Sequence, residues 1–86
     1  MTTPADVARA LTDVLEPHAG AAHVAAIFGA VRRRLNAEYL DCPPLGEVKR
    51  AMRSAGLRTH TDYCGPQVVP GVRIARQWKQ PHRPNP

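Results

Sequence analysis

The chain has 86 residues, of which 43% are hydrophobic, and a formal net charge of +5 at neutral pH. A chain this short forms one small domain with a thin core, and its apolar content is too high for a wholly disordered protein. No segment approaches the roughly 20 apolar residues that span a bilayer, and the N-terminus lacks the features of a secretory signal. We therefore expect a cytoplasmic protein whose cysteines are reduced.

The positive charge is concentrated in the second half of the chain. Residues 1–40 contain four arginines and four acidic residues, so their charges cancel. Residues 41–86 contain eight lysines and arginines but only three acidic residues, and they hold all of the excess. A basic field on one side of a protein attracts phosphate polymers, and this asymmetry favours a nucleic-acid partner.

The first predicted helix spans about residues 4–16. Thr3 can cap it, Pro4 suits its first turn, and Asp6 occupies the acidic position of a capping box. Its apolar residues fall on one face at helical spacing; they are Val7, Leu11, Val14 and Leu15. Pro17 should end this helix.

The second predicted helix begins near Ala21 and runs to about Leu35, with an extension to Leu40 left open. It has the most regular apolar stripe in the chain, formed by Val24, Ile27, Phe28, Val31 and Leu35. Residues 32–34 are all arginines in its last turns. They suit either the negative end of the helix dipole or contact with phosphate.

The third predicted helix covers about residues 44–55, after a connector that contains two prolines. Leu45, Val48, Met52 and Ala55 form its expected buried stripe. An adjoining face at the same spacing holds Gly46, Lys49, Arg50 and Arg53. Gly56 is a typical C-terminal stop, followed by Leu57 as the apolar residue that folds back.

From Leu57 the apolar period changes to two, which predicts a β-hairpin. Its first strand runs to Tyr63, and Cys64-Gly65-Pro66 is typical of a turn. The second strand places Val68, Val72, Ile74 and Trp78 on one buried face, with Trp78 anchoring the hairpin to the helices. Pro70-Gly71 interrupts this strand, as a bulge, as an edge position, or as the turn itself.

These elements predict an α+β fold, a small winged helix-turn-helix of three helices followed by a two-stranded hairpin wing. The domain covers residues 1–78. Residues 79–86 form a basic, proline-rich tail that we expect to be disordered.

A recognition helix is the function that this pattern favours. An α-helix fits the major groove of B-DNA, and basic side chains on its exposed face contact guanines or phosphates. The hairpin would lie along the backbone beside it. The predicted nucleic-acid-binding residues are Lys49, Arg50, Arg53, Arg58, His60, Arg73, Arg76 and Lys79. The alternative for the helix residues is an ordinary solvated face of an amphipathic helix.

Residues 44–57, read with Gly71-Val72-Arg73-Ile74, resemble the C-terminal winged domain of phage and plasmid primase-helicases. That resemblance covers about half the chain and implies a DNA-contact role for the basic residues of the third helix and for Arg73. Neither a nucleotide-binding loop nor a polymerase or helicase domain accompanies it, so it implies no enzymatic role. DNA binding in transcription regulation or replication of a bacterial, phage or other mobile element follows.

Two other classes of site have weaker sequence support. Cys42, His60 and Cys64 are candidate zinc ligands, with His18, His23 or His82 as the fourth. Structural zinc sites bring their ligands in close pairs, and here only His60 and Cys64 are close, so we expect neither zinc nor a disulfide. The sequence contains no recognisable catalytic motif and no recognisable cofactor-binding motif, so we expect that the protein is not an enzyme and binds no cofactor.

The competing function is a small protein-interaction module that docks an acidic partner, because winged helices also bind proteins. Pairing of two copies through the first helix would suit a two-fold DNA site. A membrane partner is not expected.

Overall fold

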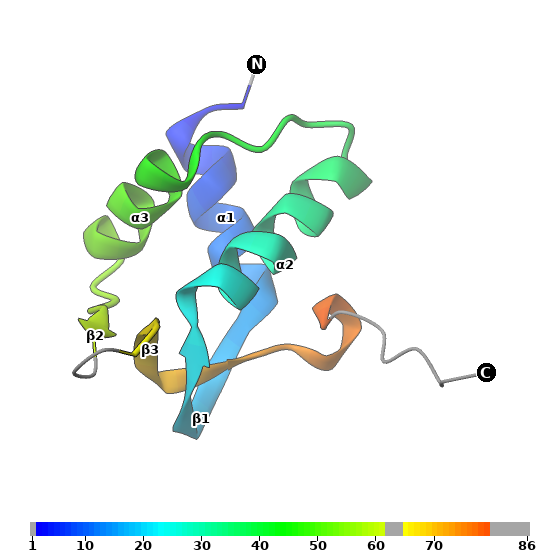
Figure 1. Cartoon of the computed structure of the whole chain (residues 1–86). Coiled ribbons are helices and arrows are strands. Elements are labelled where there is room, and N and C mark those ends of the chain that lie inside the picture. The colour runs from blue at the N-terminus through cyan, green and yellow to red at the C-terminus, as the bar shows by residue number, and fades with distance from the viewer. Residues whose placement is uncertain (1, 62–64, 80–86) are drawn as a thin grey trace.

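A computed structural model describes residues 2–61 and 65–79 of the chain. These residues form a small α+β domain in which three α-helices lie on one side of a three-stranded antiparallel sheet (Figure 1). The helices are α1 Pro4–Val14, α2 Val24–Ala37 and α3 Leu45–Ser54. The strands are β1 Leu15–His23, β2 His60–Thr61 and β3 Gln67–Ile74, and a short 3₁₀ helix, η1 Arg76–Trp78, follows.

The first helix confirms the capping box. The Thr3 side chain accepts a hydrogen bond from the backbone N–H of Asp6, and the Asp6 carboxylate accepts one from the backbone N–H of Thr3. Two otherwise orphaned donors are thereby satisfied, which fixes the start of α1. Its buried face consists of Val7, Ala10, Leu11 and Val14.

The segment after α1 corrects the sequence prediction. Residues 21–23 were expected to open the second helix, but residues 15–23 form β1, and α2 begins only at Val24. The alanines of this segment favour a helix locally. Pairing with β3, which places buried Ala22 opposite Val69, outweighs that preference.

The sheet is therefore larger than the predicted two-stranded wing. Its strand order is β1-β3-β2, so that β3 is central and pairs with both neighbours. The predicted second strand also ends earlier, at Ile74, and Trp78 lies in η1 instead of the strand. In the first strand of the hairpin only His60 and Thr61 have strand structure, and Cys64 of the expected turn lies outside the described residues.

Pro70-Gly71 is not a turn, because β3 runs through it and pairs there with β1. Its other side is an edge position within the described residues, since β2 pairs only with Gln67 and Val68. The bulge prediction is confirmed: the β1–β3 register is irregular there, with Pro17 opposite Val72 but Ala21 opposite Pro70. Gly71 has φ +83°, a backbone conformation that favours glycine. The irregularity lets Val69 and Ile74 both face the core although they are five residues apart.

Both of the remaining helices end in the same type of C-cap. After α3, the N–H of Gly56 bonds to Arg53 and that of Leu57 to Met52, with Gly56 at φ +83°. After α2, the N–H of Tyr39 bonds to Asn36 and that of Leu40 to Leu35. These are Schellman motifs. In the second one, Tyr39 takes the left-handed position, at φ +60°, that glycine normally fills.

The core lies between the helices and the inner face of the sheet. All three helices contribute to it, together with Ala22, Val69 and Ile74 from the strands. Trp78 is half-buried and packs against this core, as predicted for an anchoring residue. It does so from η1 and not from the second strand of the hairpin. Within the described residues, no helix is both long enough and apolar enough to cross a membrane.

Candidate nucleic-acid interface

The basic face of α3 is exposed as predicted. Val48 and Met52 are fully buried, which fixes how the helix is rotated against the core. Arg50 and Arg53 consequently point to solvent, and Lys49 is half-exposed beside them. The prediction that both ends of the apolar stripe are buried was wrong, because Leu45 is 39% exposed and Ala55 is also exposed.

The cations of this face have no acidic partner among the described residues. Among the described residues, none of Lys49, Arg50, Arg53 and Arg58 takes part in an ion pair. Glu47 is the only acidic residue between residues 45 and 61, so this stretch carries a net charge of +3. A surface of unpaired cations has its hydrogen-bond donors available for an anionic partner.

The arginines at the end of α2 have a structural role instead. Arg34 forms ion pairs with Asp13 at 2.8 Å and Glu38 at 2.7 Å, and its guanidinium lies 5.8 Å from the centre of the Trp78 ring. Hydrogen bonds to these two carboxylates raise the pKa of Arg34 further above its usual value. Arg33 donates hydrogen bonds to the backbone carbonyl of Trp78. Residues 33 and 34 therefore fix η1 to α2, a role that neither of the two sequence-based interpretations included.

The remaining predicted contacts are not brought to α3. Arg73 lies on β3 and forms an ion pair with its cross-strand neighbour Glu16. Arg76 and Lys79 belong to η1 and its C-cap, and η1 lies on the opposite side of the domain from α3 (Figure 1). The eight predicted contact residues thus separate into one group of five, from α3 to β2, and a distant group of three.

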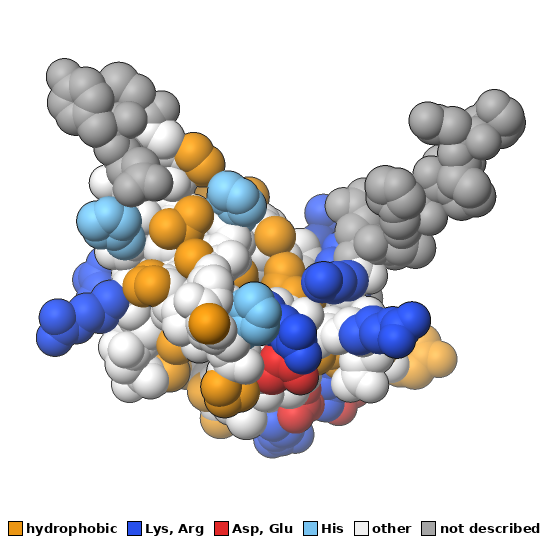
Figure 2. All heavy atoms as spheres, turned by 90° about the horizontal axis from the view of Figure 1, so that it is seen from below, with side chains coloured by type: hydrophobic (Ala, Val, Ile, Leu, Met, Phe, Trp, Pro, Cys, Tyr) orange, Lys and Arg blue, Asp and Glu red, His pale blue; other side chains and the backbone are white. Residues whose placement is uncertain are grey.

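The outer face of the sheet separates the basic regions. Seen from below the sheet, hydrophobic side chains and histidines occupy the middle, and lysines and arginines gather towards opposite sides (Figure 2). The register explains part of this pattern: His60 and His23 both lie opposite Val68, so the three residues form one row across the sheet. Because Val69 faces the core, this row faces outward.

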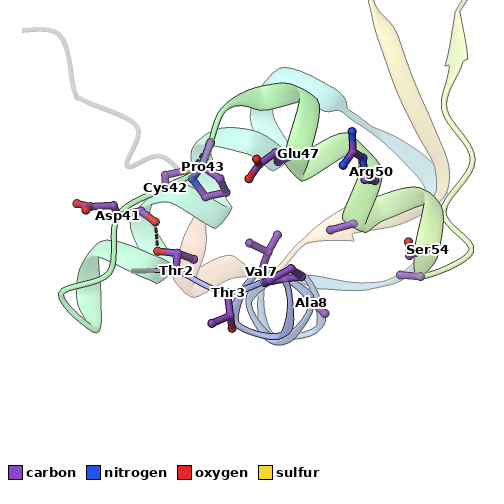
Figure 3. Close-up of a pocket in the computed structure, with 13 residues that line it drawn as sticks. Thr2, Thr3, Val7, Ala8, Asp41, Cys42, Pro43, Glu47, Arg50 and Ser54 are labelled. Carbon is purple, nitrogen blue, oxygen red and sulfur yellow. Dashed lines mark hydrogen bonds between the residues drawn. The ribbon is translucent and has the colours of Figure 1, made fainter.

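A groove of about 720 Å³ lies next to the basic face of α3, between α1, α3 and the connector that precedes α3 (Figure 3). Small side chains on the facing helices, Ala8, Ala51 and Ala55, leave this space open. Arg50 and Glu47 border it on α3, and the Thr2 hydroxyl donates a hydrogen bond to the backbone carbonyl of Asp41 at its end. Sequence reasoning missed the groove; the alanines at helical spacing were its only signal.

The thiol in this groove is not activated. Burial raises the pKa of the half-buried Cys42 thiol, which keeps it protonated and a poor nucleophile. Cys42 lies before α3 and His60 after it, and a helix of that length is about 15 Å long. In the described part of the chain, no three His, Cys, Asp or Glu residues are grouped to hold a metal. The candidate ligands Cys64 and His82 lie outside that part.

Comparison with known proteins adds no relative to this description. No protein-family model matches the chain, and neither a curated protein nor a solved structure is similar enough to count as a match.

Proposed function

We propose that this domain is a winged helix-turn-helix that binds duplex DNA without catalysis, through α3 and the segment that leads into β2. Its role would be in transcription regulation or replication of a bacterial or mobile element. The single observation that carries this proposal is the surface from Lys49 to Arg58. It is exposed, it has a net positive charge, and none of its cations has an ion pair within the described residues.

The order of elements supports the fold part of the proposal. Three helices precede a hairpin of β2 and β3, and β1 extends that hairpin to three strands. One feature departs from a simple helix-turn-helix: residues 38–44 connect α2 to α3, which is longer than the usual turn of about three or four residues. The unusual Tyr39 cap and two prolines occupy this longer connector.

The proposed contacts divide by chemistry. Arg50 and Arg53 would present planar guanidinium groups to base edges in the major groove, where a bidentate contact to guanine is the commonest specific one. Lys49 and Arg58, at the borders of this face, would pair with phosphates, which give affinity without reading sequence. His60 extends the same surface onto β2.

Fluorescence anisotropy with a labelled random-sequence duplex, at two salt concentrations, tests the proposal. We expect Arg50→Ala and Arg53→Ala each to weaken binding about tenfold. Arg9→Ala and Arg76→Ala are the matched controls. Arg9 pairs with Asp6, and Arg76 is exposed on the far side of the domain.

Equal losses for all four variants would show that binding follows total charge, and would contradict the α3 assignment. Absence of duplex binding at low salt would reject the proposal and move the function to docking of an acidic protein. A single strand bound more tightly than the duplex would also contradict insertion of α3 into a groove.

A further inference from the structure

The basic face of α3 begins with a glycine. Gly46, Lys49, Arg50 and Arg53 stand at positions i, i+3, i+4 and i+7, so they share one face of the helix. At about 100° per residue, Gly46 falls within the arc that the three basic residues define. A patch of bare backbone in the first turn of the helix therefore lies in line with the basic side chains of the next two turns.

The fold itself does not require this glycine. Its φ lies outside the left-handed region, and a Cβ built there meets no heavy atom within 4 Å. Gly56 and Gly71 differ, because both have φ +83°. A glycine in a helix is less stable than alanine, since it loses more backbone freedom on folding. Gly46 thus weakens α3 without any compensating contact in the described structure.

We infer that Gly46 is the point of closest approach between α3 and the DNA. This inference rests on the proposed function and adds a positioning residue to it. Glycine lets a backbone approach a partner more closely than any other residue does. With no side chain between them, the first turn of the helix can reach the nucleic acid while Lys49, Arg50 and Arg53 contact it from the following two turns. Exposed Leu45 borders the same turn and suits apolar contact with a thymine methyl group.

The experiment compares Gly46→Ala with Gly29→Ala. Gly29 lies within α2, where an added Cβ would make only an ordinary contact, at 3.4 Å from Nη1 of Arg33. Both substitutions should raise the Tm by about 4 °C, because both stabilise a helix. Only Gly46→Ala should weaken binding of the labelled random-sequence duplex, by about tenfold, and Gly46→Leu should weaken it further.

The salt dependence provides a second readout. Gly46→Ala changes no charge, so the slope of affinity against salt should stay that of the wild type while the affinity falls. Unchanged affinity in Gly46→Ala, together with weaker binding in Arg50→Ala and Arg53→Ala, would overturn the inference and leave the proposed function intact. Unchanged affinity in all three variants would instead reject the proposed function. If Gly29→Ala lowers the DNA affinity as much as Gly46→Ala does, the cause is the greater stiffness of the helices, and the inference is also overturned.

Discussion

Two groups of arginines in this chain have opposite surroundings. Arg33 and Arg34 are engaged within the domain, where they hold η1 against α2 through a carbonyl, two carboxylates and an aromatic ring. Arg50 and Arg53 on α3 have no such partners in the described structure. An arginine is available for recognition only where the fold leaves it unpaired. The run of three arginines in α2 is thus the denser cluster, and α3 the better candidate interface.

The largest expected effect separates stability from binding within α3. Met52→Ala should lower the free energy of unfolding by about 3 kcal/mol, because Met52 is fully buried and its truncation leaves a cavity. Arg53→Ala, at the next residue, should change it by less than about 0.5 kcal/mol. Urea titration followed by circular dichroism measures both. A destabilisation of similar size in Arg53→Ala would show that the basic face is part of the fold.

The second-largest expected effect tests whether Arg34 stabilises the fold. Arg34→Ala should cost about 1.5 kcal/mol of stability, since it removes charge-assisted hydrogen bonds to Asp13 and Glu38. Arg32→Ala is the control, because Arg32 is exposed and forms no ion pair with any described residue. Chemical denaturation of the two variants makes the comparison, and a double-mutant cycle with Asp13→Asn isolates one pair. Equal stability of the two variants would remove the distinction between the arginine groups.

A smaller effect, of opposite sign, is expected in the connector. Tyr39→Gly should raise stability by about 0.5–1 kcal/mol, because glycine adopts φ +60° without strain. The phenol ring contributes little packing, since Tyr39 is 98% exposed. Tyr39→Ala keeps the strain and removes the ring, so its thermal midpoint should stay near that of the wild type. A large loss of stability in Tyr39→Ala would show that the ring packs after all.

The smallest effect is a pH dependence at the start of α1. Hydrogen bonds from Thr3, with a contribution from Arg9, lower the pKa of Asp6 below its usual 3.8. The folded state therefore holds this proton less tightly than the unfolded state. The stabilisation is present above about pH 4 and is lost as the pH falls through the lowered value. Thermal melts from pH 2 to 6 should show a shallower acid decline in Asp6→Asn, and identical profiles would remove Asp6 as a contributor.

Local signals predicted the helices better than the sheet. The capping residues Thr3 and Asp6, the stop at Gly56 and the apolar spacing of α3 act over a few residues, so the sequence displays them directly. The strand β1 was missed because its partner, β3, follows about 50 residues later and its alanines favour a helix. The side chains of β1 are also mostly exposed and do not alternate between buried and exposed, so the strand lacks the period-two pattern that revealed the hairpin.

The candidate interface, too, was predictable from sequence only where local spacing determines it. Helical spacing alone placed Lys49, Arg50 and Arg53 on one exposed face, as the structure has them. The sequence could not show that Arg76 lies across the domain, because its position depends on where η1 packs against α2. The pairing of Arg73 with Glu16 likewise follows from the register of a strand that was not foreseen.

The central position of β3 also determines when the domain can fold during synthesis. β1 leaves the ribosome before β3, its only described strand partner, which ends at Ile74. Until that segment is released, the inner faces of α1 and α2 have no sheet to cover them, and Ala22 lacks Val69 opposite it. Contacts so distant in sequence slow folding. The core of the domain can therefore close only after β3 has been synthesised, and a truncation before β3 would leave the three helices without a closed core.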